Sequence, residues 1–417
     1  MSSQQQTDFD VLIVGGGMVG ASLAIALKDQ ALRIGMIEAV AWQQDDKSCY
    51  DDRSIALAWG SRRIFESMGV WSGMDASATA IRSIHVSDRG HFGFTRLHAQ
   101  EQQVEALGYV ITARAIGKAL SDALSAQPNV TLITPAIVKQ VRVEDNCATV
   151  SVDLEGCEQH YRASLVVGAD GVKSSVRELL GINTRVNEYG QTAVIANLSP
   201  EKPHNHVAYE RFTNTGPMAL LPLDHDRCAL VWTVKDADVE QAMGLSDEEF
   251  LQAIQERFGY RLGRLLKVGK RHAYPLRLVR AEEQIRARVA LIGNAAHTLH
   301  PVAGQGFNLG LRDTATLAQV IAEALGKGRD IGALSILKRY AEWRVSDHDR
   351  VINFTDNLVR LFSNNALPLS FARNVGLLAA DVLPPVKRAL LRRAMGVYGH
   401  LPRLARGLPL QEKPHDH

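Results

Sequence analysis

The chain has 417 residues, of which 46% are hydrophobic and 22% are charged, and its formal net charge is +2. This balance is typical of a globular protein and excludes a disordered, collagen-like or membrane-bundle chain, while the length suits two domains or one large domain with an insertion. The small net charge produces no overall field that would attract nucleic acid, so we expect no nucleic-acid partner.

The cysteines and the N-terminus bear on the cellular compartment. The cysteines are widely spaced, with no CxxC pair and no Cys/His cluster, at Cys49, Cys147, Cys157 and Cys228. This spacing predicts neither a zinc site nor a disulfide framework and favours a reducing compartment. The opening MSSQQQTDFD has no basic and apolar signal segment, and no run of about 18 apolar residues occurs in the chain. We therefore expect a cytoplasmic protein without a transmembrane anchor.

The first glycine-rich motif follows an apolar run near the N-terminus. The run DVLIV (residues 10–14) predicts a strand, and the stretch ASLAIAL (21–27) predicts a helix. Between them lies a GxGxxG pattern formed by Gly15, Gly17 and Gly20. In this context the glycines permit a tight turn, the approach of a pyrophosphate to the backbone and close packing of the helix on the strand. The motif predicts a dinucleotide site, although it does not by itself separate NAD from FAD.

An acidic residue strengthens this prediction. A second predicted strand, residues 33–37, ends at Glu38, where a carboxylate can accept hydrogen bonds from an adenosine ribose. The alternative is a glycine-rich turn that binds nothing, and the presence of the acid at the expected spacing disfavours it.

Two further stretches repeat the order of strand, glycine-containing loop and helix. SLVVGADGVKSSVR (164–177) predicts a strand that runs into Asp170 and Gly171. ARVALIGNAAHTLHPVAGQGFNLG (287–310) predicts a strand, then a loop, and then a long helix from about Asn308. Loops of this kind lie at the strand ends where α/β sheets bind ligands.

Together the three motifs resemble those of the group A flavoprotein aromatic hydroxylases. The resemblance implies an α/β fold with a p-hydroxybenzoate-hydroxylase-like FAD-binding domain on a Rossmann-type parallel sheet, an inserted antiparallel-sheet substrate domain and a helical C-terminus. It also implies that one FAD uses all three motifs. Its ADP half lies at the first motif, its pyrophosphate near the second, and its ribityl chain and flavin ring at the third.

The resemblance assigns cofactor contacts to individual residues. Helix N-termini and glycine backbones offer N–H groups to the pyrophosphate and to the flavin edge where negative charge gathers. The implied FAD-binding residues are Gly15, Gly17, Gly20, Glu38, Arg53, Arg114, Asp170, Gly171, Gly293, Asn294, Pro301, Gly304, Gln305 and Gly306. For Arg114 a surface ion pair is an equal alternative. The wider family has Gly-Asp where this chain has Gly293-Asn294, but Asn keeps an acceptor and a donor for ribityl hydroxyls, so we expect FAD binding to survive.

Four longer stretches narrow the resemblance to the ubiquinone-biosynthesis hydroxylases, and among these to the enzymes that hydroxylate a polyprenyl methoxyphenol. The stretches are DDRSIALAWGSRRIFESMGVW (51–71), IHVSDRGHFGFTRL (84–97), YERFTNTGPMALLPL (209–223) and HPVAGQGFNLGLRD (300–313). They do not fix the ring carbon that is hydroxylated, the length of the prenyl tail, the choice of NADH or NADPH, or the oligomeric state.

The implied activity is that of an FAD-dependent monooxygenase. Such an enzyme takes electrons from NADH or NADPH, reacts with O2 and transfers one oxygen atom from a flavin C4a-hydroperoxide to a carbon of a polyprenylated phenol. A base at the phenol oxygen would make the ring more nucleophilic, and the positional candidates are His204, His206, Tyr209 and Tyr274. Two alternatives stay open: an FAD-dependent oxidase or reductase, and a noncatalytic flavoprotein that serves as an assembly subunit of a quinone-biosynthesis complex.

His297 and His300 raise the question of a metal site. Their spacing can place both on one face of a helical turn, but no third ligand is evident nearby in the sequence, and the third motif accounts for both positions. We therefore expect no metal.

Changes of pattern divide the chain into regions. In 186–275, strand-like runs separated by turn residues predict an antiparallel sheet, and a capping box at Ser246 and Glu249 with a stop at Gly259 predicts a helix. The expected FAD-binding domain covers 1–80, 100–185 and 276–330, the substrate domain covers 81–99 and 186–275, and a helical region covers 331–417.

The C-terminal region carries an unusual charge pattern. Residues 382–411 contain no acidic residue and interleave lysines and arginines with apolar residues. Such a stretch can lie on an anionic membrane, which would suit a polyprenylated substrate. The equal alternative is a helix packed on its own domain with a solvated cationic face. The expected partners are thus the phenol substrate and O2 and, in the first alternative, the inner membrane face and other quinone-biosynthesis enzymes.

Overall fold

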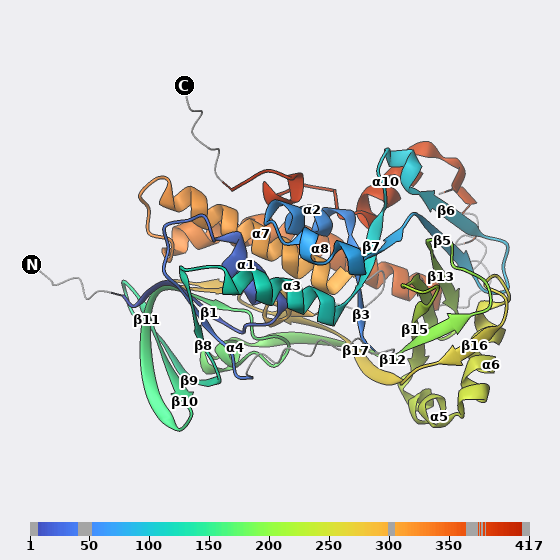
Figure 1. The fold of residues 1–417 in the computed structure, drawn as a ribbon, viewed down its shortest axis with the longest axis horizontal. Helices are drawn as coiled ribbons and strands as arrows, with labels where there is room; N and C mark the ends of the chain where they lie inside the picture. The colour runs from blue at the N-terminus through green and yellow to red at the C-terminus, as the bar shows by residue number, and fades with distance from the viewer. Residues whose placement is uncertain are drawn as a thin grey trace, which may run out of the picture.

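The computed structural model describes residues 7–40, 52–298, 305–363, 374, 376, 378–379 and 381–410. Two large sheets lie side by side along the long axis of the molecule, and most of the long helices cover the first of them (Figure 1). This is the mixed α/β architecture with an inserted antiparallel sheet that the motifs predict.

The first sheet carries the strands of all three glycine-containing motifs. Its order is β18-β19-β11-β1-β2-β8, and β10 and β9 extend it from β11. The pairs β1–β11, β1–β2, β2–β8 and β11–β19 are parallel. The bounds are β1 Phe9–Val14, β2 Ile34–Ile37, β8 Val130–Ile133, β9 Ala136–Val143, β10 Ala148–Leu154, β11 Cys157–Gly168, β18 Ile285–Arg286 and β19 Val289–Leu291.

The register of the parallel strands brings the motifs together. Val14 at the end of β1 lies beside Gly168 at the end of β11, and Gly168 lies beside Leu291 at the end of β19. The loops that follow these strands therefore lie together at the carboxyl-terminal ends of the strands, which is where parallel α/β sheets bind ligands.

Helices cover this sheet and form the main hydrophobic core with it. Helix α1 packs against α3 and α7, and α7 packs against α8. The third-motif helix includes Gln305 and thus begins before the predicted Asn308, because Gly306 is accommodated in its first turn. The bounds are α1 Met18–Ala26, α2 Trp59–Ser67, α3 Ala113–Ser125, α4 Ser175–Leu179, α7 Gln305–Leu325 and α8 Leu334–Ser363.

The second sheet has the order β20-β17-β12-β15-β14-β13-β5-β6, with β16 paired to β12. It is antiparallel apart from β5 and β13, which run parallel, because residues 83–98 enter the sheet from a distant part of the chain rather than through a hairpin. The bounds are β5 Ser83–Asp88, β6 Phe94–His98, β12 Thr184–Pro200, β13 Val207–Thr213, β14 Gly216–Pro222, β15 Cys228–Lys235, β16 Leu265–Val268, β17 His272–Ala281 and β20 His297–Thr298.

Two helices cover the outer face of the second sheet. They are α5 (Val239–Gly244) and α6 (Asp247–Phe258). The predicted capping box of α6 is confirmed, since the Ser246 side chain accepts from the Glu249 N–H and the Glu249 side chain accepts from the Ser246 N–H. The helix ends at Gly259, which has φ +86°. Phe250, Ile254 and Phe258 lie buried against the sheet.

Two long strands of the second sheet, β12 and β17, span the expected domain boundaries. Strands β12 and β17 pair from Thr184↔Ala281 to Ile195↔His272 and cross the expected boundaries at 185/186 and 275/276 without a break. Their register shifts between Glu188 and Thr192, where Gly190 has φ +64°. The boundaries inferred from changes of pattern therefore lie within these two strands.

A small third sheet and the C-terminal helix complete the described structure. The small sheet has the order β3-β7-β4, with β3 Ser54–Ala58, β4 Thr79–Ile81 and β7 Gly108–Thr112. Helix α10 (Pro384–Ala394) lies near β6 and β7 (Figure 1). Across the described ranges, no helix combines the length and the apolar character needed to cross a membrane.

Candidate cofactor and substrate site

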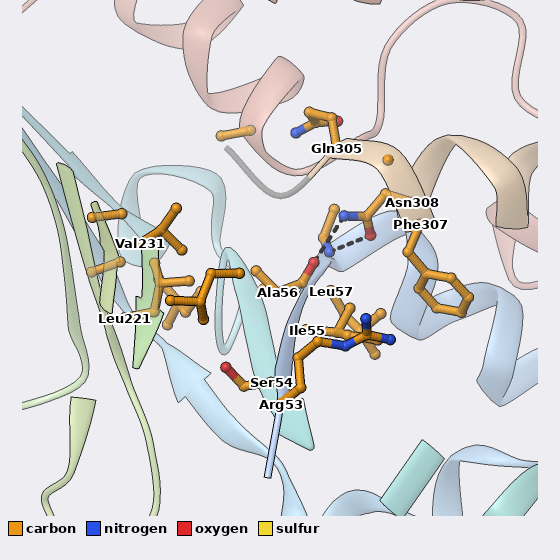
Figure 2. A pocket seen from close by; sticks show the side chains of 18 of the residues that line it. Arg53, Ser54, Ile55, Ala56, Leu57, Leu221, Val231, Gln305, Phe307 and Asn308 are labelled. Atoms are coloured by element: carbon orange, nitrogen blue, oxygen red, sulfur yellow. Dashed lines mark hydrogen bonds between the residues drawn. The ribbon is translucent and has the colours of Figure 1, made fainter. Parts of the chain in front are cut away.

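A cavity of about 540 Å³ lies between the glycine loops and the second sheet. Its lining includes Gly17 of the first motif, Gly171 of the second, and Asn294 of the third. In Figure 2, Leu221 and Val231 of the second sheet lie on one side, β3 passes through the middle, and the start of α7 lies on the other side. One continuous space therefore touches all three motifs and the second sheet.

The glycines of the first motif serve two different purposes. A Cβ atom on Gly15 would lie 2.6 Å from the Ala169 carbonyl oxygen, and one on Gly20 would lie 1.9 Å from the Gly15 carbonyl oxygen. The protein's own backbone therefore requires these two glycines. A Cβ on Gly17 would have no atom within 4 Å, and Gly17 lines the cavity. Its small size keeps that part of the cavity open.

Glu38 connects the end of β2 to the same loop. Its Oε2 atom accepts a hydrogen bond from the Gly16 N–H at 2.7 Å, and its Oε1 atom accepts one from the Val40 N–H at 3.0 Å. Each carboxylate oxygen can accept more than one hydrogen bond, so a ribose hydroxyl can still bind there.

The second motif presents an unpaired acceptor. Asp170 Oδ2 accepts from the Val176 N–H at 3.0 Å and thereby holds the start of α4, while Oδ1 is buried without a partner among the described residues. Gly171 has φ +80°, lines the cavity and has open space where a Cβ would project. A buried acceptor and an open glycine at one loop fit a ligand that brings hydrogen-bond donors.

The third motif is tied to the first motif and to the start of α7. Gly293 has φ +58°, and a Cβ there would lie 3.1 Å from Val19 in α1. Asn294, Gln305 and Gly306 line the cavity, and Gly306 has open space where a Cβ would project. Pro301 and Gly304 lie outside the described residues.

Asn308 attaches α7 to β3 (Figure 2). Its Nδ2 donates to the Ala56 carbonyl at 2.9 Å, and its Oδ1 accepts from the Ala58 N–H at 2.8 Å and from the Ser61 hydroxyl at 2.6 Å. The helix that begins at the third motif is thereby fixed against the strand that passes through the cavity. The sequence motifs do not mark this residue as part of the site.

The two predicted arginines have different surroundings. Arg53 is exposed and lines the cavity. Arg114 forms an ion pair with Asp52, with Nε 2.9 Å from Oδ2. Arg114 thus forms an ion pair, which is the alternative role considered for it from the sequence. Contact of Arg53 or Arg114 with FAD stays a prediction.

Asp313 of α7 is the centre of a buried cluster. Its Oδ2 accepts from the Gly293 N–H at 3.0 Å and from His297 Nε2 at 2.6 Å. Its Oδ1 accepts from Arg344 Nε at 2.6 Å and from His348 Nε2 at 2.7 Å. Although burial opposes ionisation, the surrounding basic groups hold the pKa of Asp313 well below its usual range.

The same cluster brings His297, Asp313 and His348 into an arrangement that could hold a metal ion, with ligand atoms within 4.8 Å of one another. However, the Nε2 atoms of His297 and His348 each lie at hydrogen-bond distance from the Asp313 carboxylate. The Arg344 guanidinium is also in direct contact with this carboxylate. A cation would compete with a fixed positive charge for that carboxylate. The geometry therefore favours a hydrogen-bonded cluster over a metal centre, and His300 lies outside the described residues.

The second sheet forms the opposite wall of the cavity. Four neighbouring strands place one residue each in a row across it, with Glu210 paired to Ala219, Ala219 to Val231, and Val231 to Ile195. All four line the cavity. Tyr209 also contributes to the lining, but because side chains alternate along a strand, its ring lies on the other face of the sheet, where it packs against Phe258 of α6.

The structure accounts for the positional candidates for a base. His204 Nε2 donates to the Leu223 carbonyl at 2.7 Å, and His206 Nδ1 donates to the Ala80 carbonyl at 3.0 Å. Tyr274 is 40% exposed on β17. The cavity lining also contains Glu210, which the sequence motifs do not single out and whose pKa is raised to about 7 by burial.

The cavity as a whole fits a dinucleotide cofactor. Glycine loops with open space line it, the loop of Gly171 also carries the unpaired buried acceptor of Asp170, and the three motif helices begin at the same end of the parallel sheet. The family model described as FAD binding domain matches residues 8–355. The chain therefore belongs to the family of FAD-binding flavoproteins that includes the ubiquinone hydroxylases.

Individual relatives narrow the class. The ubiquinone hydroxylase UbiL of Rhodospirillum rubrum is 39% identical over 406 residues, which cover 96% of this chain and 93% of that protein. The 3-demethoxyubiquinol 3-hydroxylase of Escherichia coli is 33% identical over 394 residues, which cover 93% of this chain and 98% of that protein. These names agree with the predicted FAD-dependent hydroxylase and do not favour the oxidase or assembly-subunit alternatives.

A solved structure supports the fold. The p-nitrophenol 4-monooxygenase PnpA from Pseudomonas putida DLL-E4 superimposes with a TM-score of 0.77 at 18% identity. The superposition covers 94% of this chain and 98% of that chain. The predicted p-hydroxybenzoate-hydroxylase-like class is thus confirmed at the level of architecture.

Proposed function

We propose that this protein hydroxylates a polyprenyl methoxyphenol in ubiquinone biosynthesis, using FAD, NADH or NADPH, and O2. The observation that carries the proposal is the single cavity that connects three FAD-type motifs to an apolar wall. Relatives named as ubiquinone hydroxylases support the substrate class. Bound FAD supplies the redox chemistry by taking electrons from the nicotinamide and activating O2.

The proposed cofactor contacts follow the three motifs. The backbone around Gly15, Gly17 and Gly20 would receive the pyrophosphate, and Glu38 would receive the ribose. Asp170 and Gly171 would contact the middle of the cofactor, and the open acceptor of Asp170 supports this assignment. The ribityl chain and flavin ring would lie against the third motif, at Gly293, Asn294, Pro301, Gly304, Gln305 and Gly306. Arg53 would border the cofactor, and Arg114 would do so only after release from Asp52.

The second sheet would orient the phenol and exclude water. Its cavity wall is formed mostly by small and branched apolar side chains, including Ala219, Leu221 and Val231. A dry wall limits loss of activated oxygen to solvent. The glycine loops lie on one side of the cavity and the second sheet on the other. This separation supports the proposed assignment of 1–80, 100–185 and 276–330 to FAD binding and of 81–99 and 186–275 to substrate binding.

Helix α10 supports a membrane surface as a partner. Its Leu391 is fully buried, and its Ala394 lines the cavity. Val382, Leu383 and Val386 are exposed, as are several arginines of the helix. One face therefore packs on the protein while another offers apolar and cationic groups to an anionic bilayer. Such a surface beside the cavity would receive a prenylated substrate at the inner membrane face, where other quinone-biosynthesis enzymes could act on it.

The test is the mass of the product formed by FAD-loaded protein with NAD(P)H, isotopically heavy O2 and a methoxyphenol with one short prenyl chain. The proposal requires one heavy oxygen in the phenol, coupled to NAD(P)H consumption. Hydrogen peroxide as the only oxygen product would favour an oxidase. Bound FAD without any substrate-stimulated NAD(P)H consumption would favour an assembly subunit.

The membrane proposal is tested with vesicles. Full-length protein should sediment with vesicles that contain anionic phosphatidylglycerol and less with neutral phosphatidylcholine vesicles. Leu383→Ser together with Val386→Ser should reduce sedimentation severalfold, because it removes exposed apolar area without opening the core. Equal sedimentation of the double variant and the wild type would contradict the proposal.

A further inference from the structure

Glu210 is the only carboxylate among the described residues that line the cavity. It lies on β13 in the row of wall residues that includes Ala219, Val231 and Ile195. Its side chain is half-buried and forms no hydrogen bond or ion pair with any described residue, and its pKa is raised by desolvation alone. The cavity therefore contains an acidic group that the protein itself does not satisfy.

An unpartnered carboxylate is an unfavourable choice for an apolar wall. Burying a charge without a partner costs free energy, and buried carboxylates are normally paired or hydrogen-bonded. The neighbouring wall positions carry the small and branched residues expected of a surface that binds an apolar ring. The position of Glu210 thus points to a ligand that brings its own donor, and the substrate proposed above has one such group, the phenol O–H.

We propose that Glu210 is the general base that accepts the phenolic proton of the substrate, an inference that rests on the proposed hydroxylase function. The O–H bond breaks, the proton moves to a Glu210 carboxylate oxygen, and the electron pair stays on the phenol oxygen and spreads to the ring carbons. After the ring has gained its oxygen atom, it loses the C–H proton to solvent and the phenol oxygen recovers a proton from Glu210. The carboxylate is thereby regenerated, and the two electrons needed for O2 come from NAD(P)H.

The electrostatics of the wall suit this role. Burial raises the pKa of Glu210 to about 7, which brings it closer to that of a phenol than an ordinary carboxylate. The charged or titratable groups on the adjoining described elements are Arg53 of the cavity lining, Arg211 next to Glu210 on β13, and His85 and Asp88 on either side of Val86, the β5 partner of Glu210. Asp88 is held by His91 and Asn374. Tyr209 also titrates but its ring packs on the opposite face.

The test compares FAD-loaded wild type with Glu210→Gln, which keeps the shape and removes the base. The probe is a methoxyphenol with one short prenyl chain. In the variant, kcat for hydroxylation should fall by about 10²–10⁴, KM should change little, and the share of NAD(P)H electrons lost to hydrogen peroxide should rise. In the wild type the hydroxylation rate should fall as pH drops below about 7, and this limb should be absent from the variant.

Two readouts separate proton transfer from a structural effect. A ring-fluorinated probe with a more acidic phenol should recover part of the activity lost in Glu210→Gln, because it needs less help to ionise. Anaerobic reduction of the bound flavin by NAD(P)H without the phenol probe, followed by the change in flavin absorbance, should keep its wild-type rate in Glu210→Gln. Glu188→Gln, an exposed acid on β12 paired with Arg277, is the matched control and should match wild type.

The outcomes distinguish this inference from the proposed function. If wild type places no heavy oxygen in the phenol, the hydroxylase proposal fails and this inference fails with it. If wild type hydroxylates the probe while Glu210→Gln keeps the rate and the pH profile, only the role of Glu210 is overturned. A slow variant that the acidic probe does not rescue assigns Glu210 to substrate shape and also overturns the proposal.

Discussion

The two sides of the cavity are built by opposite means. On the glycine-loop side, the chain constrains itself, since Gly15 and Gly20 have no room for a side chain and Asp313 is saturated by four donors. On the second-sheet side, the wall is apolar and its one carboxylate, Glu210, has no partner in the described structure. The first side holds a shape through internal contacts, and the second leaves a contact for a ligand to complete. Substitutions should therefore destabilise the first side and spare the second.

The largest effect is expected from Gly20→Ala. The added methyl group would lie 1.9 Å from the Gly15 carbonyl oxygen, so α1 must separate from β1 or the loop must move. We expect a loss of stability of about 4 kcal/mol or more, measured by denaturant unfolding. Gly17→Ala is the matched control, because open space surrounds that position, and it should keep the fold and weaken only FAD binding, measured by flavin fluorescence. Equal destabilisation by both changes would contradict this division.

Asp313→Asn should have the next largest effect. It removes the negative charge while Arg344 stays fully buried beside it. Leaving one partner of a buried pair unpaired costs about 3–5 kcal/mol. Denaturant unfolding of the variant should show this loss of stability. Asp347 also pairs with Arg344 and therefore offsets part of the loss. A loss below about 1 kcal/mol would mean that the Asp313 cluster does not constrain the glycine-loop side.

Mild acid should also weaken the first side. Burial lowers the pKa of His348 to about 4 from an ordinary value of 6.5. As the pH falls, His348 therefore binds a proton in the unfolded chain at a higher pH than in the folded protein. The contribution of neutral His348 is fully present above pH 6.5 and is lost as pH falls toward 4, by about 3 kcal/mol. Burial likewise lowers the pKa of His85 to about 4, and because His85 lies on β5 of the second sheet, it adds a loss of stability on that side. Unfolding measured from pH 7.5 to 5 should become easier, and His348→Gln should flatten part of this dependence.

The smallest effect has the opposite sign. Because the folded-state pKa of Glu210 is raised to about 7, its ionisation above that pH opposes folding. Glu210→Gln should therefore raise the free energy of unfolding at pH 8 by about 1–3 kcal/mol, measured with FAD bound, and the gain should vanish near pH 5. A variant that is less stable at pH 8 would mean that Glu210 has a stabilising partner.

The sequence predicts the first side of the cavity well and the second side poorly for a physical reason. A glycine loop between a strand and a helix is a local pattern, so the sequence alone marks Gly17, Gly171 and Gly306 as candidates. Glu210 reads in sequence as an ordinary polar position beside Tyr209, and nothing local says which of the two faces the cavity. That choice depends on the register of β13 with β14 and β15, which is set by side chains elsewhere in the sheet.

Asp313 escapes sequence reasoning for a related reason. It reads as a polar residue on an amphipathic helix, yet Gly293, His297, Arg344 and His348 converge on it from other parts of the chain. The sequence pairs His297 with its near neighbour His300, whereas the partner of His297 in space is His348, with ring centroids 4.3 Å apart. Long-range convergence of this kind has no signature in a single sequence.

The irregular pairing of β12 and β17 has a consequence for how such a wall can change. Within the second sheet, the two strands pair in one register from Thr184 to Glu188 and in another from Thr192 to Ile195. Side chains alternate along a strand, so inserting or deleting one residue beyond the shift would turn Ile195 outward and bring the opposite set of side chains inward. A one-residue insertion or deletion at this point can thus exchange the two faces of β12 at the cavity wall, while β13, β14 and β15 keep their own alternation.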